Sequence, residues 1–138
     1  MNNSSMASEY ILRSMRTLKE SSDAFNDGDM YYTALRLSET LENMSNVLLS
    51  LYGILDISFS PVEVLGFLEI SREIDQKVKG IINEIQDLWR QLSALKMLNE
   101  SPTKAPSVLA RGQEMKLILD RVTSLFDKVQ GIFDDFHH

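Results

Sequence analysis

Apolar residues recur through most of the chain at alternating steps of three and four, the spacing that places side chains on one face of an α-helix. The longest series covers residues 60–98 and is interrupted only at Ser71. A helix start is indicated at its first residues, where Ser60 is a suitable N-cap, Pro61 suits the first helical position and Glu63 stands in the capping-box position. The apolar members of the series are Val64, Phe67, Ile74, Val78, Ile81, Ile85, Leu88, Leu92 and Leu95.

Three other segments carry the same spacing. The first, residues 8–26, is the shortest and the weakest, because Ser22 stands at an apolar position of its series. The second covers residues 30–55, and the last begins within residues 102–113 and ends near Phe136. The apolar positions of these segments are Ile11, Met15, Leu18 and Phe25, with Leu12 beside them; Met30, Ala34, Leu37, Leu41, Met44, Leu48, Leu51 and Leu55; and Met115, Ile118, Val122, Leu125, Val129, Ile132 and Phe136.

The segments between these helices are rich in turn residues. Asp27-Gly28-Asp29 combines a glycine that can end a helix in the left-handed conformation with aspartates that can cap the next helix. Residues 56–60 turn the chain again, and residues 99–106, which hold two prolines, form the clearest loop. Because the first loop is short, the first two helices are expected to be antiparallel neighbours.

The helix over residues 60–98 decides the expected shape. If it is unbroken, it is about 57 Å long, more than a compact chain of this length needs. Gly66 is the expected place for any break in the first two turns, because glycine costs about 1 kcal/mol relative to alanine inside a helix.

The apolar faces are wider than a two-stranded coiled coil requires. About three apolar positions in seven is the pattern of a helix packed against two neighbours. We therefore predict an all-α fold, an elongated antiparallel bundle of about four helices with up-down topology, of which three are long and the N-terminal one is shorter. Residues 1–8 are expected to form a flexible arm and residues 9–138 a single helical-bundle domain. The residues that widen the faces are Leu68, Ile82, Trp89, Leu119, Phe126 and Phe133.

Charge and composition narrow the classes of partner. The chain has 138 residues, a formal net charge of −6 and no cysteine. Its acidity and its scattered lysines and arginines argue against a nucleic-acid or anionic-membrane partner. No apolar run approaches the roughly 18 residues of a membrane span, and the polar first residues do not resemble a signal peptide. We expect a cytoplasmic location, with which the lack of cysteine is compatible.

No catalytic, metal-binding or cofactor-binding site is predicted. The histidines are His137 and His138, whose terminal position resembles the edge of a purification tag. Without cysteine or an internal histidine, a zinc site would need carboxylates alone, and a serine nucleophile would have no histidine base. The paired carboxylates lie mostly off the apolar series, as on solvated helix faces, and no glycine-rich phosphate loop is present. We therefore expect a protein that is not an enzyme and needs no cofactor.

Protein binding is the hypothesis that remains. Long helices with wide apolar faces favour a module that holds a partner's amphipathic helix in an apolar groove, as an adaptor, a complex-assembly subunit or a secretion-type chaperone. The alternative is a homo-oligomeric structural protein whose third helix pairs with its own copy. Candidate partner-binding residues are Tyr31, Tyr32, Trp89, Leu119 and Phe133. For each, the competing interpretation is structural: the tyrosines cover the first turn, and the other three residues pack between helices.

Overall fold

The computed structural model describes residues 3–54, 60–71, 73–99 and 108–137, and within these ranges it contains five helices and no strand. The helices are α1 (Asn3–Asn26), α2 (Met30–Leu51), α3 (Pro61–Ser71), α4 (Gln76–Asn99) and α5 (Val108–Asp135). The all-α prediction is confirmed, whereas the predicted number of about four helices is too low by one.

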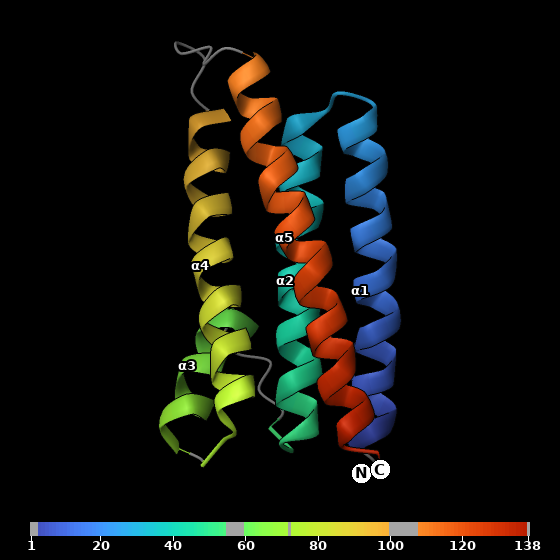
Figure 1. Cartoon of the computed structure of the whole chain (residues 1–138), viewed down its shortest axis with the longest axis vertical. Coiled ribbons are helices and arrows are strands. Elements are labelled where there is room, and N and C mark those ends of the chain that lie inside the picture. The colour runs from blue at the N-terminus through green and yellow to red at the C-terminus, as the bar shows by residue number, and fades with distance from the viewer. Residues whose placement is uncertain (1–2, 55–59, 72, 100–107, 138) are drawn as a thin grey trace.

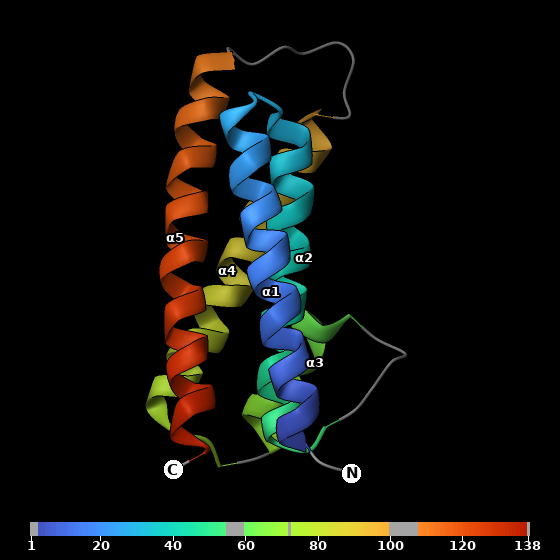
Figure 2. The same cartoon turned by 90° about the vertical axis from the view of Figure 1, so that its right-hand side faces the viewer.

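The long helices α1, α2, α4 and α5 lie side by side along the longest axis of the molecule (Figure 1). The chain ascends along α1, descends along α2, ascends along α4 and descends along α5, so that both termini lie at the same end (Figures 1 and 2). The short helix α3 lies beside the lower part of α4. Helix α2 is central, because it contacts each of the other four helices.

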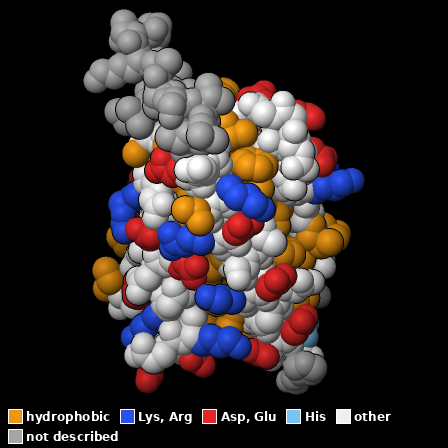
Figure 3. Space-filling view, turned by 45° about the horizontal axis from the view of Figure 1, so that its top comes forward, with side chains coloured by type: hydrophobic (Ala, Val, Ile, Leu, Met, Phe, Trp, Pro, Cys, Tyr) orange, Lys and Arg blue, Asp and Glu red, His pale blue; other side chains and the backbone are white. Residues whose placement is uncertain are grey.

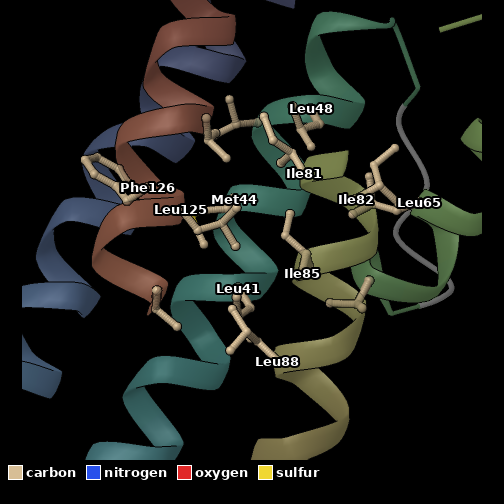
Figure 4. Close-up of a cluster of buried hydrophobic side chains, with 14 of the residues drawn as sticks. Leu41, Met44, Leu48, Leu65, Ile81, Ile82, Ile85, Leu88, Leu125 and Phe126 are labelled. Atoms are coloured by element: carbon tan, nitrogen blue, oxygen red, sulfur yellow. The ribbon is translucent and has the colours of Figure 1, made fainter. Parts of the chain in front are cut away.

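The core is one continuous cluster of aliphatic side chains. Figure 4 shows its middle, where Leu41 and Met44 of α2 face Ile85 of α4. From α3, Leu65 reaches toward Ile82 of α4, so the short helix contributes to the same core. The predicted series of the later helices account for most of the cluster, including Leu37, Leu41, Leu48, Ile81, Ile85, Leu88, Leu92, Ile118, Val122, Leu125 and Val129.

Helix α1 differs from its prediction in both length and face. It begins at Asn3 rather than at residue 8, and its 24 residues make it as long as α4, so the N-terminal helix is not the shorter one. Met15, predicted in the core, is 48% exposed, and Leu12 is 63% exposed. The buried face instead carries mostly small residues: Ala7, Ile11, Ser14, Thr17, Ser21 and Ala24.

Small buried residues bring α1 and α2 close together. The hydroxyls on this face are satisfied locally: Ser14 donates to the carbonyl of Tyr10 at 2.8 Å and Ser21 donates to that of Leu18 at 2.6 Å. A hydrogen bond between two buried hydroxyls crosses the interface, from Thr40 Oγ1 to Thr17 Oγ1 at 2.8 Å. Serine and threonine can replace leucine here because their only polar groups are already bonded, which removes the cost of burying them.

The turn between α1 and α2 forms as predicted. Gly28 adopts a left-handed φ of +81°, and the N–H of Asp29 donates to the carbonyl of Ala24, which closes the end of α1. Of the two candidate caps, Asp29 is the one used, since its carboxylate accepts from the N–H of Tyr32 at 2.9 Å.

Helix α2 ends at Leu51, four residues before its predicted end. The reason is a second left-handed glycine, Gly53, with a φ of +74°, after which the N–H of Ile54 donates to the carbonyl of Leu49. Leu55 lies outside the described residues.

The prediction of a single helix over residues 60–98 is wrong, because this segment contains two helices, α3 and α4. The break does not fall at Gly66 but after Ser71, and Asp75 caps α4 by accepting the N–H of Lys77 at 2.9 Å. The predicted cap of α3 also differs, because Ser60 accepts the Val64 N–H through its carbonyl while its buried hydroxyl has no partner among the described atoms.

Core burial explains the break. With α3 turned away from the axis of α4, Leu65 and Leu68 become fully buried. Burying a leucine side chain stabilises by roughly 1.5–3 kcal/mol, whereas each helical hydrogen bond lost contributes a net of about 1 kcal/mol. Two leucines therefore outweigh the few hydrogen bonds of a continuous helix.

Helix α5 begins at Val108, inside the predicted range, and buries its predicted series from Met115 to Ile132. Phe136 is an exception, because α5 ends at Asp135 and leaves the ring largely exposed. Most of the loop predicted over residues 99–106 lies outside the described residues.

Candidate interaction surface

Large apolar side chains that face solvent are the main candidates for a functional surface. Among the described residues they lie on α1, α2, α3 and α5 and just beyond the end of α5, and the two on α3 are prominent: Ile70 is 86% exposed and Phe67 is 65% exposed. The others are Leu12, Met15, Tyr31, Tyr32, Leu117 and Phe136.

Helix α3 exposes these residues because its apolar side chains are spread around the helix and not confined to one face. Its sequence, PVEVLGFLEIS, places Val62, Leu65 and Leu68 on the face that packs against α2 and α4. Phe67 and Ile70 are three residues apart, so they lie one turn apart on the opposite face. We call Phe67 and Ile70 the α3 patch.

Sequence reasoning missed the α3 patch. Phe67 belongs to the predicted core series, and this prediction is wrong because the series assumes that α3 continues α4. The available signal is composition: a helix of eleven residues whose apolar side chains surround it cannot bury every one of them against one neighbouring layer.

The five predicted partner-binding residues lie in different environments. Tyr31 and Tyr32 are exposed at the start of α2. Trp89 and Phe133 are half-buried against the core, and Leu119 is 6% exposed within it. The structure does not bring the five together into one surface.

Tyr32 is tied into a charged network. The guanidinium of Arg36 lies 4.6 Å from the centre of the Tyr32 ring and donates a hydrogen bond to its hydroxyl. Arg36 also pairs with Glu39 at 2.7 Å and with Glu20 of α1 at 3.4 Å. The hydrogen bonds to Tyr32 and Glu39 raise the pKa of Arg36. This network links α1 to α2 and fixes the Tyr32 ring.

Two shallow depressions are lined by a mixture of charged and apolar side chains. One, of about 270 Å³, lies at the α1–α2 turn and is lined by Glu20, Asp23, Ala24, Asp27, Asp29 and Tyr32. The other, of about 310 Å³, lies between α4 and α5 and is lined by Gln76, Lys77, Gly80, Ile81, Glu84 and Lys128. Across the described part of the chain, no group of three or more acidic or histidine side chains is arranged to hold a metal ion.

The end of the bundle near the C-terminus is aromatic. Tyr52 and Phe136 meet edge to face at 5.3 Å, and His137 stacks on Phe133 at 4.2 Å. Burial, with a smaller contribution from the charge of Asp75, raises the pKa of Tyr52. These contacts attach the last residues of α5 to the end of α2.

Charges of both signs are mixed over the face shown in Figure 3, with apolar side chains between them. Several acid–base pairs join neighbouring helices, such as Arg121 with Asp87 at 3.2 Å and Lys128 with Glu84 at 3.3 Å. This face therefore shows no continuous basic field of the kind that nucleic-acid binding requires.

No helix in the described residues is long and apolar enough to cross a membrane. Comparison of the chain with protein-family models, with curated proteins and with solved structures gives no match.

Proposed function

We propose that this chain is a non-enzymatic protein-interaction module, an up-down helical bundle whose α3 docks an amphipathic helix of a partner protein. The observation that supports the proposal most strongly is the α3 patch, with Phe67 65% and Ile70 86% exposed on one helix face. An adaptor, an assembly subunit or a secretion-type chaperone would each use such a face.

The free energy gained by covering these two side chains supports the proposed docking of a partner helix. Removing a phenylalanine or isoleucine side chain from water stabilises by roughly 1.5–3 kcal/mol, so a bound helix that covers both gains from each. Single exposed apolar residues are common on monomers, but two that are adjacent on one face form a contiguous patch, which is typical of interaction sites.

The spacing of the α3 patch fits a helical partner. Residues three apart on one helix match the apolar stripe of a second helix, whose own apolar residues recur every three or four positions. The homo-oligomeric alternative uses the same face with a second copy as the occupant.

The test compares two matched variants as baits in an affinity purification from source cells. Phe67→Ser combined with Ile70→Ser removes the α3 patch, whereas Leu117→Ser removes one leucine that is 66% exposed on α5. We expect the double variant to recover at least about tenfold less of a stoichiometric partner, and the control to recover the wild-type amount.

Thermal unfolding serves as the folding control for both variants. Because the replaced side chains are exposed, each change should alter stability by only about 0.5 kcal/mol. Equal recovery of the partner by the wild type and the folded double variant would contradict the proposal.

A further inference from the structure

The outer face of α1 carries an apolar pair with the same spacing as the α3 patch. Leu12 is 63% exposed and Met15 is 48% exposed, three residues apart on the side of α1 that faces away from the bundle. We call Leu12 and Met15 the α1 patch. Both patches therefore consist of two large apolar side chains one helical turn apart.

The charges beside the α1 patch are basic. Residues 12–19 contain three cations, Arg13, Arg16 and Lys19, and no acidic residue. Arg13 is paired with Glu9 at 2.6 Å. Arg16 and Lys19 are exposed, four residues after Leu12 and Met15 respectively, and form no ion pair within the described part of the chain.

The charges beside the α3 patch are acidic. Residues 60–75 contain four acidic residues and one basic residue, Arg72. Glu63 precedes Phe67 by four residues on α3, and Glu73 lies two residues beyond the end of this helix; both are exposed. Neither forms an ion pair with any other described residue.

From these two surfaces we propose that the α1 patch of one copy docks on the α3 patch of a second copy, so that the chain self-associates head to tail. This inference rests on the proposed function, because it names the occupant of the same docking face. Apolar residues cover apolar residues in such a contact, while Arg16 and Lys19 meet Glu63 and Glu73 of the second copy.

The fold makes this contact possible only between copies. Helices α1 and α3 do not contact each other, and Figure 1 shows them on opposite sides of the bundle. A contact between two different faces is heterologous, so one copy of a pair keeps a free α3 patch and the other keeps a free α1 patch, and the assembly grows beyond a dimer or closes into a ring.

Charge favours this pairing over a symmetric one. Two α3 patches facing each other would bring the glutamates of both copies together, and two α1 patches would do the same with their cations, which costs binding energy in either case. The heterologous pairing alone joins opposite charges. Because each patch is small, the contact is expected to be weak and concentration-dependent.

The test uses two charge-reversal variants of the full chain. One carries Glu63→Lys and Glu73→Lys, and the other carries Arg16→Glu and Lys19→Glu. Sedimentation equilibrium of the wild type between about 10 μM and about 1 mM should show a mass that rises past that of the dimer. Each variant alone should associate at least about tenfold more weakly.

Mixing the two variants gives the most specific result. In the mixture, the unchanged basic α1 patch of the first variant can bind the unchanged acidic α3 patch of the second. The reversed α3 patch of the first variant is basic and the reversed α1 patch of the second is acidic, so these two patches can also bind each other. Association should therefore return. A control with Asp127→Lys and Asp134→Lys changes the net charge as much as the first variant does, at exposed positions of α5, and should associate like the wild type.

Three outcomes would overturn the inference. A wild type that stays monomeric at every concentration excludes a second copy, although Phe67 and Ile70 can still be needed for capture of a foreign partner, in which case the proposed function stands. Association that survives Arg16→Glu with Lys19→Glu indicates a contact that does not use α1. Loss of association that mixing does not restore excludes the heterologous pairing.

Discussion

Ser21 is completely buried between α1 and α2, although its side chain carries a polar hydroxyl. Its hydroxyl donates to the carbonyl of Leu18, so it needs no partner from another helix. What the interface requires at this position is a small side chain, because a larger one would hold α1 away from α2.

Replacing Ser21 with leucine should destabilise the protein despite the gain in apolar character. We expect a loss of about 1–3 kcal/mol in the free energy of unfolding, because the added carbons overpack the interface. Ser22→Leu is the matched control at a half-buried position and should cost less than about 1 kcal/mol. Urea unfolding of both variants measures the difference. A more stable Ser21→Leu variant would show that the interface has room.

The face of α1 could not be predicted from hydrophobic periodicity alone. The pattern ranks Met15 and Leu12 above Ser14 and Ser21 because it weighs each side chain by its transfer from water. It takes no account of hydroxyls that are satisfied inside their own helix, nor of the close approach that small residues allow. Where large aliphatic residues dominate, as in α2 and α5, the same pattern identifies the core correctly.

Helix ends follow local chemistry, and the sequence predicts several of them well. Gly28 and Asp29 occupy the positions that the stop-and-start signal indicates. The end of α2 differs from its prediction because the apolar spacing runs on past Gly53, whose left-handed conformation stops the helix. For predicting where a helix ends, a glycine is therefore a stronger indicator than the continuation of the apolar series by one residue.

Asp29→Ala should destabilise the protein by about 1 kcal/mol, because it leaves the N–H of Tyr32 without its side-chain acceptor. For a domain of this size, the unfolding temperature should fall by roughly 2–5 °C. Asp27→Ala is the control, since its carboxylate caps no described helix, and should change stability by less than about 0.5 kcal/mol. Equal losses in the two variants, measured by calorimetry, would contradict the assignment of the cap.

The cap residue Asp75 is a local signal for the start of α4, but it does not by itself predict that α3 separates from α4. No proline or glycine marks residues 72–75, and the three-and-four spacing continues through them apart from Ser71. The decisive term is tertiary, namely the burial of Leu65 and Leu68 against α2 and α4. The apolar spacing within one segment does not show where the other helices will pack against it.

At the scale of the whole molecule, the same break creates the candidate site. Once α3 turns to bury Leu65 and Leu68, Phe67 and Ile70 must face away from the core. Sequence reasoning led to the expectation of an interaction protein but placed the candidates elsewhere, at residues such as Trp89 and Leu119, which pack in or against the core.

The charged residues are also distributed unevenly over the molecule. The chain is acidic as a whole, with a net charge of −6, yet residues 12–19 of α1 carry three cations and no anion. Helices α1 and α3 lie on opposite sides of the bundle (Figure 1), so the proposed contact between their two patches would join copies without a symmetric interface.

The central claim is that the α3 patch binds another polypeptide, and contact-site photo-crosslinking tests it most directly. Replacing Ile70, which is 86% exposed, with benzoylphenylalanine places a reactive group on the patch, and the same replacement at Leu117, which is 66% exposed, gives an exposed apolar reference on α5. We expect a strong cross-link to a second polypeptide from position 70, whether foreign or another copy, and at most background from position 117. No cross-link from position 70, or equal cross-linking from both positions, would contradict it.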